Sequence, residues 1–289
     1  MSEIAVLRQA LRRLPALKGD WTFEHLGQNA YCLQQGGRRF FAKWIADDDE
    51  RGRNELEIYR TVLRRADLPT PALLHVLPAG PGRLALWEWL DGEDLRQEGR
   101  QLLPQAFRLL GHFHAAQRHT GPLSSPVTAQ VYASVADLLQ GEAATLAALL
   151  PPSFRQPCAD FLMRLTCGYP TLIHGDMHPG NLRRVAEGLY FVDWGYARRS
   201  LNLFDLDYIR SLDLGDQITE WWHIRPEEAV HILPAYFEAA GLSACDCWAI
   251  HRGVMLWSAL WAHFNLARAH DLAAQKTCRQ RITRILEEK

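Results

Sequence analysis

The 289-residue sequence lacks an excess of either charge: 32 basic and 33 acidic residues give a formal net charge of −1. A protein without a basic field does not attract nucleic acid or an anionic membrane through its overall charge. We therefore expect neither a nucleic acid nor a membrane as a partner. A small neutral or zwitterionic ligand is compatible with this charge.

Cysteine is sparse, and its six copies follow no metal-binding pattern. A zinc site needs two closely spaced pairs of ligands, and Cys245 and Cys247 have no second pair to complete one. The sequence therefore predicts reduced thiols and a cytoplasmic protein. The six cysteines are Cys32, Cys158, Cys167, Cys245, Cys247 and Cys278.

The sequence also lacks an apolar run long enough to cross a bilayer. The longest, residues 253–267, is interrupted by Ser258, His263 and Asn265, whereas a spanning helix needs about 20 predominantly apolar residues. Residues 1–14 alternate apolar and basic side chains at helical spacing and lack the features of a secretory signal. They are predicted to form a first helix. The composition, 48% hydrophobic and 22% charged, is that of a globular protein with a substantial core.

The side chains that can carry chemistry gather in residues 172–195. The motif HGDMHPGN, residues 174–181, follows an apolar lead-in, and its glycines and proline prevent regular helix or strand. Residues 182–185 and 189–192 then flank an Ala-Glu-Gly turn and predict a hairpin whose second strand ends at Asp193.

Three polar residues of this segment supply what phosphoryl transfer from a nucleotide needs. Asp176 offers a carboxylate to orient a hydroxyl and accept its proton, and Asn181 and Asp193 offer hard oxygen ligands for magnesium. An Asp, an Asn five positions later and an Asp twelve positions after that match the catalytic and metal loops of protein-kinase-like enzymes. A polar turn without chemistry explains any one of these residues but not six matched positions in order.

The histidine form of the motif narrows the family. HGDxHxxN followed by an apolar strand and DW resembles the aminoglycoside phosphotransferase and choline kinase family, the small-molecule branch of the kinase-like fold. The resemblance implies that Asp176 is the catalytic base and that Asn181 and Asp193 hold the metal. His174 and His178 are expected to be packed histidines that hydrogen-bond loop carbonyls and so hold Asp176 in place, with a direct role in the chemistry as the alternative.

Residues 21–45 predict a small antiparallel sheet from three alternating segments, 21–26, 30–35 and 38–45. The break before Ala30 contains a single glycine and is typical of an ordinary hairpin. Its position makes Asn29 a candidate for covering nucleotide phosphates with backbone N–H groups. Lys43 lies in an apolar strand, where its charge needs water or an anion, and a nucleotide phosphate would serve.

Residues 54–63 have apolar positions at helical spacing, and Glu55 is placed to meet Lys43. In kinase-like folds such an ion pair directs the lysine at the phosphates. Glu57 is the competing partner, and a solvated helix face is the alternative for both acids.

Two further strands, residues 73–77 and 83–89, lead into the sequence WEWLDG. This stretch resembles the family's interlobe hinge. The resemblance implies that backbone groups near Glu88 and Leu90 bind adenine, which needs only backbone donors and acceptors.

Beyond the hinge the sequence is mostly helical. Residues 102–119 predict a helix that resembles the family's LGxxLAxLH segment, and residues 127–167 predict two helices separated by two prolines. Asp205 lies in a segment that opens a further helix and aligns with the family's acid that hydrogen-bonds the catalytic loop from below. Residues 198–202 depart from the family's usual glycine and aspartate.

The chain after Asp207 is left to form the wall of the acceptor site. Two adjacent tryptophans point to different sides of a helix, and an aromatic wall beside acids suits an amine-bearing or sugar-like ligand. Core packing is the alternative. The predicted wall consists of Asp213, Asp216, Glu220, Trp221 and Trp222.

These features predict an α+β, bilobal protein-kinase-like fold. Residues 1–90 are expected to form the N-terminal nucleotide-binding lobe, a helix plus an antiparallel sheet. Residues 91–289 are expected to form the C-terminal helical lobe with the catalytic loop and the acceptor site.

The predicted function is transfer of phosphate from ATP, with Mg²⁺, to a hydroxyl of a small molecule such as an aminoglycoside, amino alcohol, vitamin or sugar. An atypical protein kinase is disfavoured because no long activation segment follows Asp193. A silent nucleotide-binding protein is disfavoured by the presence of Lys43, Asp176, Asn181 and Asp193 together. The sequence does not choose among the acceptors.

Overall fold

The structure, a computed structural model, describes residues 3–14, 19–128, 130–210 and 223–287. The chain divides into two compact units, residues 1–94 with 181–197 and residues 95–180 with 198–289. Contacts group residues 181–197 with the first unit, although they lie within the range 91–289 predicted for the C-terminal lobe. The predicted α+β class is confirmed, because the first unit contains an antiparallel sheet and the second is mostly helical.

Five antiparallel strands form the main sheet of the first unit, in the order β1-β2-β3-β5-β4. Gly36 and Gly37 turn the chain between β2 and β3 with φ values of 53° and 82°. Such a turn favours glycine because a side chain rarely adopts positive φ. The strands are β1 Thr22–Gly27, β2 Ala30–Gln35, β3 Arg38–Ala46, β4 Leu73–Pro78 and β5 Gly82–Glu88.

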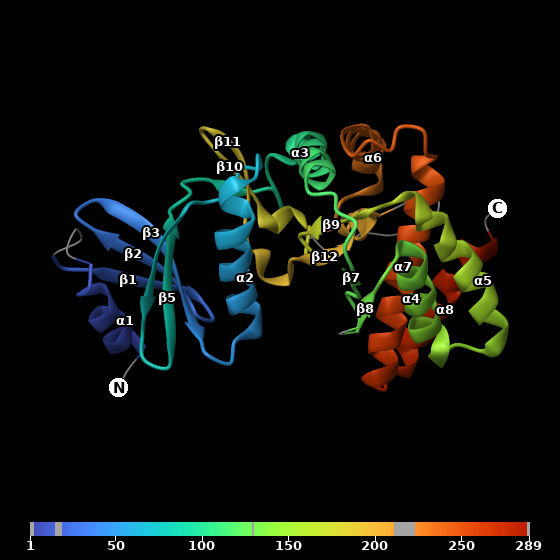
Figure 1. Cartoon of the computed structure of the whole chain (residues 1–289), viewed down its shortest axis with the longest axis horizontal. Coiled ribbons are helices and arrows are strands. Elements are labelled where there is room, and N and C mark those ends of the chain that lie inside the picture. Colours follow the sequence, from blue (N-terminus) through green and yellow to red (C-terminus); the bar gives the residue numbers. More distant parts are fainter. Residues whose placement is uncertain (1–2, 15–18, 129, 211–222, 288–289) are drawn as a thin grey trace. The chain divides into compact units, whose positions relative to one another are not determined.

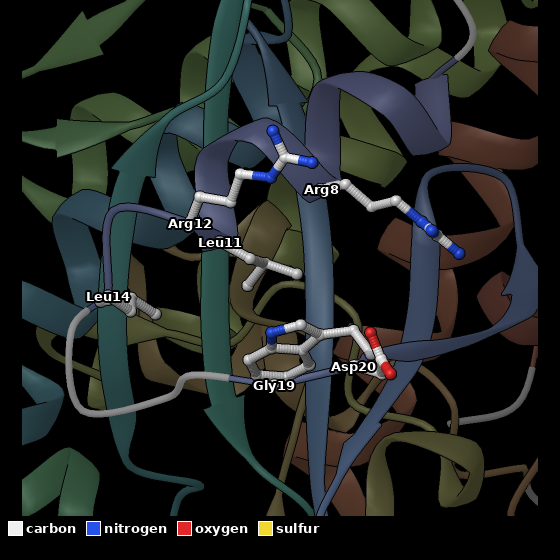
Figure 2. A pocket seen from close by; sticks show the side chains of 7 residues that line it. Arg8, Leu11, Arg12, Leu14, Gly19 and Asp20 are labelled. Carbon is white, nitrogen blue, oxygen red and sulfur yellow. The ribbon is translucent and has the colours of Figure 1, made fainter.

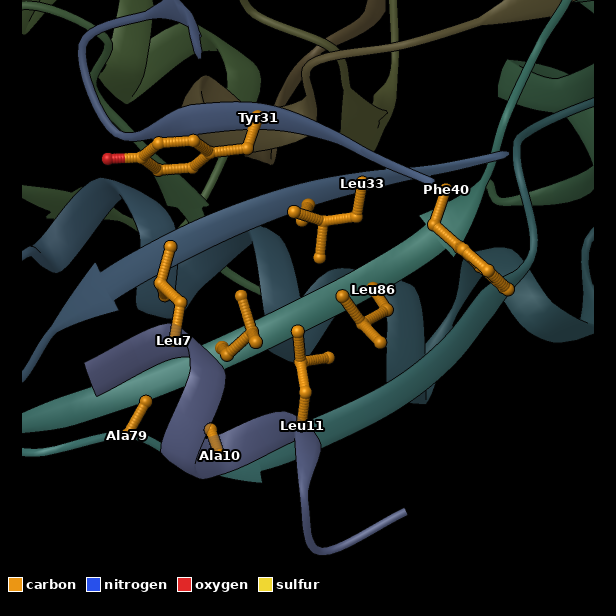
Figure 3. Packing of buried hydrophobic residues seen from close by; sticks show 10 residues of the cluster. Leu7, Ala10, Leu11, Tyr31, Leu33, Phe40, Ala79 and Leu86 are labelled. Carbon is orange, nitrogen blue, oxygen red and sulfur yellow. The ribbon is translucent and has the colours of Figure 1, made fainter. Parts of the chain in front are cut away.

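Helix α1 (Glu3–Leu11) covers one face of this sheet and confirms the predicted first helix. Its Leu7 and Leu11 are buried in one cluster with Leu33 and Phe40 of the neighbouring strands (Figure 3). Burial of each such side chain contributes roughly 1.5–3 kcal/mol, so this apolar face anchors α1 to the sheet.

Helix α2 (Glu50–Thr61) covers the other face of the sheet (Figure 1). Side chains alternate along a strand, so Phe41 and Lys43 of β3 point to the side opposite Phe40. The Trp87 ring contacts Phe41 and also Tyr59 of α2, with ring centroids 5.9 and 5.6 Å apart. The polar Lys43 therefore lies on the face that α2 covers.

Helix α2 begins at Glu50, four residues before the predicted start. Asp49 caps it, because its carboxylate accepts the backbone N–H of Gly52 at 2.9 Å. The earlier start adds one turn to the helix ahead of Glu55.

A hairpin of β10 (Leu182–Val185) and β11 (Gly188–Phe191) completes the first unit and confirms the predicted hairpin. The short strand β6 (Glu93–Asp94) pairs with β10. Gly92 precedes it and must remain small, since a Cβ there would lie 1.9 Å from the carbonyl oxygen of Arg184.

Helices dominate the second unit, and α3 and α6 pack closely. A Cβ on Gly111 of α3 would lie 2.7 Å from the carbonyl oxygen of Tyr236 in α6, so glycine permits this approach. The helices are α3 Leu103–Ala116, α4 Val135–Leu146, α5 Pro152–Leu162, α6 Pro226–Ala239, α7 Cys247–Arg268 and α8 Leu272–Glu287, with short strands β7 Leu123–Ser124, β8 Val131–Tyr132, β9 Pro170–Ile173 and β12 Arg198–Leu201.

The helix predicted to open at the segment that contains Asp205 is instead a short 3₁₀ turn, Asn202–Leu206. The Asn202 side chain accepts the backbone N–H of Tyr169 at 2.9 Å and donates to the Tyr236 hydroxyl at 3.0 Å. The turn is therefore tied into the surrounding core and does not continue as a regular helix.

None of the six cysteines, all of which lie in the described residues, forms a disulfide. Across the described part of the chain, every helix is too short or too polar to cross a membrane.

Candidate functional site

In the second unit, Asp205 holds the start of the loop that carries the HGD motif. Its carboxylate accepts the backbone N–H groups of His174 and Gly175, each at 2.7 Å. His114 Nε2 lies 3.2 Å from the same carboxylate, and His114 Nδ1 lies 2.8 Å from the Tyr236 hydroxyl. A buried carboxylate with this many donors is a rigid anchor for the loop.

Burial alone would raise the pKa of Asp205. The hydrogen bond and charge of His114, with the N–H of Gly175, outweigh burial and hold this pKa below its ordinary value. Asp205 is therefore ionised at neutral pH, which keeps the loop anchored.

Asp176 lies on this loop with both carboxylate oxygens near polar groups. Its Oδ1 accepts the hydroxyl of Tyr208 at 2.7 Å, and His178 Nε2 lies 3.8 Å from its Oδ2. The side chain of Asp176 is 18% exposed, so it is held in place and still open to a ligand.

His178 supports the loop from within. Its Nδ1 accepts the backbone N–H of Gly180 at 3.0 Å, and its ring packs edge-on against Tyr208 at 5.4 Å. Because Nδ1 accepts a hydrogen bond, a neutral His178 carries its proton on Nε2, the nitrogen that faces Asp176. His174, by contrast, is fully buried.

Tyr208 is a residue of the candidate site that the sequence motifs did not identify. Burial raises its pKa, and the charges of Asp207 and Asp176 raise it further, so the hydroxyl remains protonated and donates to Asp176. Tyr208 follows Asp205 by three residues, about one turn of 3₁₀ helix. That spacing places it on the same side as the anchor and could have identified it.

In the first unit, Lys43 pairs with Glu55. Lys43 Nζ donates to Glu55 Oε2 at 2.8 Å, whereas Glu57 is exposed, so the alternative left open by the sequence is decided for Glu55. Burial alone would lower the pKa of Lys43. The charges of Glu55 and Asp193 outweigh burial and raise this pKa, which keeps the ammonium charged.

Asp193 ends the hairpin in the left-handed conformation, with φ 61° and ψ 65°. Asp and Asn tolerate this region better than other side chains. Its Oδ2 accepts Arg51 Nη2 at 2.7 Å, and its Oδ1 lies 3.7 Å from Lys43 Nζ. The carboxylate is thus turned toward two cations, and its side chain is 36% exposed.

Asn181 and Asp193 fit a magnesium ion. The backbone N–H of Val192 donates to the carbonyl of Asn181 at 3.0 Å and extends the β10–β11 ladder, so residues 181 and 193 lie at the same end of the hairpin. An amide and a carboxylate oxygen suit Mg²⁺, which keeps water and phosphate oxygens as its other ligands. Among the described residues, no group of three or more His, Cys, Asp or Glu side chains could hold a metal ion.

Helix α2 places two more residues beside Asp193 that the sequence analysis missed. Arg51 pairs with Asp193, and the Asn54 side-chain amide donates to the carbonyls of Gly195 and Ala197 at 3.1 and 2.8 Å. Arg51, Asn54 and Glu55 occupy positions i, i+3 and i+4, which share one helix face. The predicted helix began at residue 54 and excluded Arg51, so this shared face was not recognised from the sequence.

The predicted nucleotide residues elsewhere in the first unit are engaged with the sheet. The Asn29 side chain donates to the carbonyl of Trp44 at 2.6 Å, which ties the β1–β2 turn to β3. The Glu88 N–H donates to Ala72 at 3.0 Å, and the Leu90 carbonyl accepts Gly92 N–H at 3.1 Å. The contacts of Asn29, Glu88 and Leu90 with a nucleotide stay predictions.

The predicted acceptor wall lies outside the described residues. It consists of Asp213, Asp216, Glu220, Trp221 and Trp222.

A pocket of about 260 Å³ lies on the first unit, at the end of α1 and the approach to β1 (Figure 2). Arg8, Arg12 and Asp20 contribute its charged side chains. None of its seven lining residues is a predicted site residue, so this pocket is separate from the candidate site.

A family model described as the phosphotransferase enzyme family matches residues 24–257. A comparison with curated proteins finds no match.

Solved structures resemble the chain over nearly its whole length. One is a thermostable mutant of aminoglycoside phosphotransferase APH(4)-Ia in ternary complex with ADP and hygromycin B, at 14% identity and TM-score 0.62, covering 98% of this chain and 97% of that chain. Another is the GDP complex of aminoglycoside 2'-phosphotransferase-IIIa, at 13% identity and TM-score 0.61, covering 99% of each chain.

A third is the choline kinase LicA from Streptococcus pneumoniae, at 15% identity and TM-score 0.58, covering 99% of this chain and 100% of that chain. These matches confirm the predicted protein-kinase-like fold.

Proposed function

The chain belongs to the phosphotransferase enzyme family, and from that premise we propose that it is an ATP-dependent kinase that phosphorylates a hydroxyl of a small molecule. The observation that carries the proposal is in the first unit. The ammonium of Lys43 lies 2.8 Å from the Glu55 carboxylate and 3.7 Å from that of Asp193. The Lys43 ammonium therefore lies beside the carboxylate that is proposed to bind the metal. Transfer of a phosphoryl group requires such a cation and such an acid close together.

Lys43 would pair with phosphate oxygens of the nucleotide while Glu55 holds its side chain in position. Asn181 and Asp193 would hold Mg²⁺. When bound, the metal supplies positive charge that neutralises the phosphates during transfer. Backbone groups at Asn29, Glu88 and Leu90 would complete the nucleotide site.

Asp176 is the proposed catalytic base. Its carboxylate is partly exposed, with Oδ1 accepting the Tyr208 hydroxyl and Oδ2 lying 3.8 Å from His178 Nε2. An acceptor hydroxyl that binds at this carboxylate is oriented for attack and loses its proton to Asp176. Tyr208 and His178 act through Asp176 as positioning residues, and Asp205 fixes the loop beneath them.

The acceptor is proposed to be an aminoglycoside, amino alcohol, vitamin or sugar. The solved relatives include a structure with hygromycin B and a choline kinase, which supports a compact polar molecule with hydroxyl groups. Residues Asp213, Asp216, Glu220, Trp221 and Trp222 remain the proposed wall of its site.

A coupled assay of ADP release over a panel of such alcohols tests the proposal. We expect Mg²⁺-dependent release that requires one class of alcohol and is lost in Asp176→Asn. A protein that binds ADP tightly yet releases none with any acceptor would be a silent nucleotide-binding protein. Release that requires a protein substrate would make it an atypical protein kinase.

A further inference from the structure

Four charged side chains in the first unit, one of them Asp193, form a cluster whose formal charges sum to zero. Lys43 and Arg51 are positive, and Glu55 and Asp193 are negative. The nitrogen–oxygen distances of the ion pairs are 2.8 Å for Lys43–Glu55 and 2.7 Å for Arg51–Asp193. The proposed metal ligand Asp193 is therefore already neutralised by the protein. A divalent cation that approached it alone would meet both positive charges.

The position of the Arg51 side chain is fixed by its neighbours Tyr196 and Gly195. Its guanidinium carbon stands 4.1 Å from the centre of the Tyr196 ring, a cation–π contact. A Cβ on Gly195 would lie 2.5 Å from both Cγ and Nε of Arg51. Only glycine at position 195 leaves room for this arginine.

Arg51 also has the chemistry to change partners. A guanidinium binds phosphate as well as carboxylate, in both cases through paired N–H donors. Its side chain is 35% exposed, so it reaches solvent as well as Asp193. A nucleotide brings several negative charges, whereas Mg²⁺ alone brings only more positive charge.

We propose that Arg51 makes metal binding conditional on the nucleotide. Without nucleotide, Arg51 neutralises Asp193 and opposes Mg²⁺. When the magnesium nucleotide binds, the metal takes the Asp193 carboxylate and Arg51 pairs with a phosphate oxygen. This inference rests on the proposed role of Asp193 as a metal ligand.

The test measures binding, with Mn²⁺ as a spectroscopic substitute for Mg²⁺ and ADP as the nucleotide. In Arg51→Gln we expect Mn²⁺ alone to bind about tenfold more tightly, and ADP in the presence of Mn²⁺ to bind about tenfold more weakly. By linkage, the enhancement of Mn²⁺ affinity by ADP equals the enhancement of ADP affinity by Mn²⁺. With ADP affinity in the absence of metal unchanged, this enhancement should shrink about tenfold. Arg51→Lys keeps the charge and should retain part of the ADP affinity.

Two further variants separate charge from structure. Arg53→Gln removes the same charge from an exposed position of the same helix and should change neither affinity. Gly195→Ala removes no charge but displaces the Arg51 side chain, so it should reproduce the effect of Arg51→Gln. Thermal unfolding of each variant shows that it is folded.

Wild-type Mn²⁺ and ADP affinities in folded Arg51→Gln would overturn the inference. Weaker ADP binding with an unchanged affinity for Mn²⁺ alone would leave Arg51 as a phosphate ligand and overturn the conditional role. Asp193→Asn in the same assay distinguishes the two proposals. If that variant binds Mn²⁺ and ADP normally, the metal site itself is wrong, whereas loss in Asp193→Asn alone refutes only the role of Arg51.

Discussion

The carboxylates of Asp193, in the first unit, and Asp205, in the second, are stabilised by different kinds of contact. Asp193 is partly exposed and contacts the cations Arg51 and Lys43. Asp205 is buried and accepts the N–H groups of His174 and Gly175. Exposed ion pairs contribute little to stability and exchange partners easily, whereas a buried carboxylate that loses its donors costs several kcal/mol. The first arrangement suits a ligand that comes and goes, and the second suits a fixed support.

The largest effect on turnover is expected at Asp176, which lies on the loop that Asp205 anchors. Asp176→Asn keeps the shape and still accepts the Tyr208 hydrogen bond, but it removes the base. Turnover should fall roughly a hundredfold or more, with ADP affinity nearly unchanged. Steady-state kinetics and ADP titration measure the two quantities. Wild-type turnover in the purified variant would mean that Asp176 is not the base.

The next largest effect is expected at Asp193, on the side of the exchangeable ion pairs. Asp193→Asn tolerates the left-handed backbone as Asp does, so it tests the charge without added strain. Affinity for the magnesium nucleotide should fall roughly ten- to a hundredfold, and Asn181→Ala should be milder, because an uncharged ligand contributes less. Magnesium titrations of ADP binding measure both. An unchanged magnesium requirement in Asp193→Asn would argue against this metal site.

The buried His251 of the second unit predicts that the stability of the protein depends on pH. Burial lowers its pKa to about 4, while its Nε2 lies 3.0 Å from the Ile209 carbonyl. In the unfolded chain the pKa is about 6.5, so protons favour the unfolded state between these values. Stability should be lost as pH falls from about 6.5 to about 4, by roughly 3 kcal/mol from this residue.

His251→Gln keeps a donor for Ile209 and removes the titration. Urea unfolding of the two proteins between pH 4 and pH 7 measures the difference. Their difference in unfolding free energy should vary with pH. A constant difference over this range would show that His251 does not stay neutral in the folded state.

The smallest effect is expected at Tyr208, which acts through Asp176. Tyr208→Phe removes one hydrogen bond to the ionised carboxylate and leaves the ring that packs on His178. We expect a fall in kcat of about threefold to tenfold with the KM for ATP unchanged. The acid limb of the kcat profile should also move to higher pH, which a purely structural role would not produce. A variant with an unmoved profile would remove Tyr208 from the positioning role.

Much of the fold followed from local patterns. Alternation and turn residues predicted β2 at its observed bounds and the hairpin after Asn181, because side-chain period and glycine placement act within a few residues. The start of α2 and the short turn at Asn202 were missed. Both depend on side-chain hydrogen bonds, from Asp49 and from Asn202, that a hydrophobic pattern does not contain.

The sequence by itself determined the family, through a motif whose residue types and spacing leave few alternatives, and it named Lys43, Asp176 and Asp193 as the groups to examine. Only the tertiary structure decided which acid pairs with Lys43 and that Arg51 meets Asp193. Arg51 and Asp193 are 142 positions apart in the chain. Local periodicity carries no information about contacts over such separations, because they are set by how α2 and the hairpin pack together within the first unit.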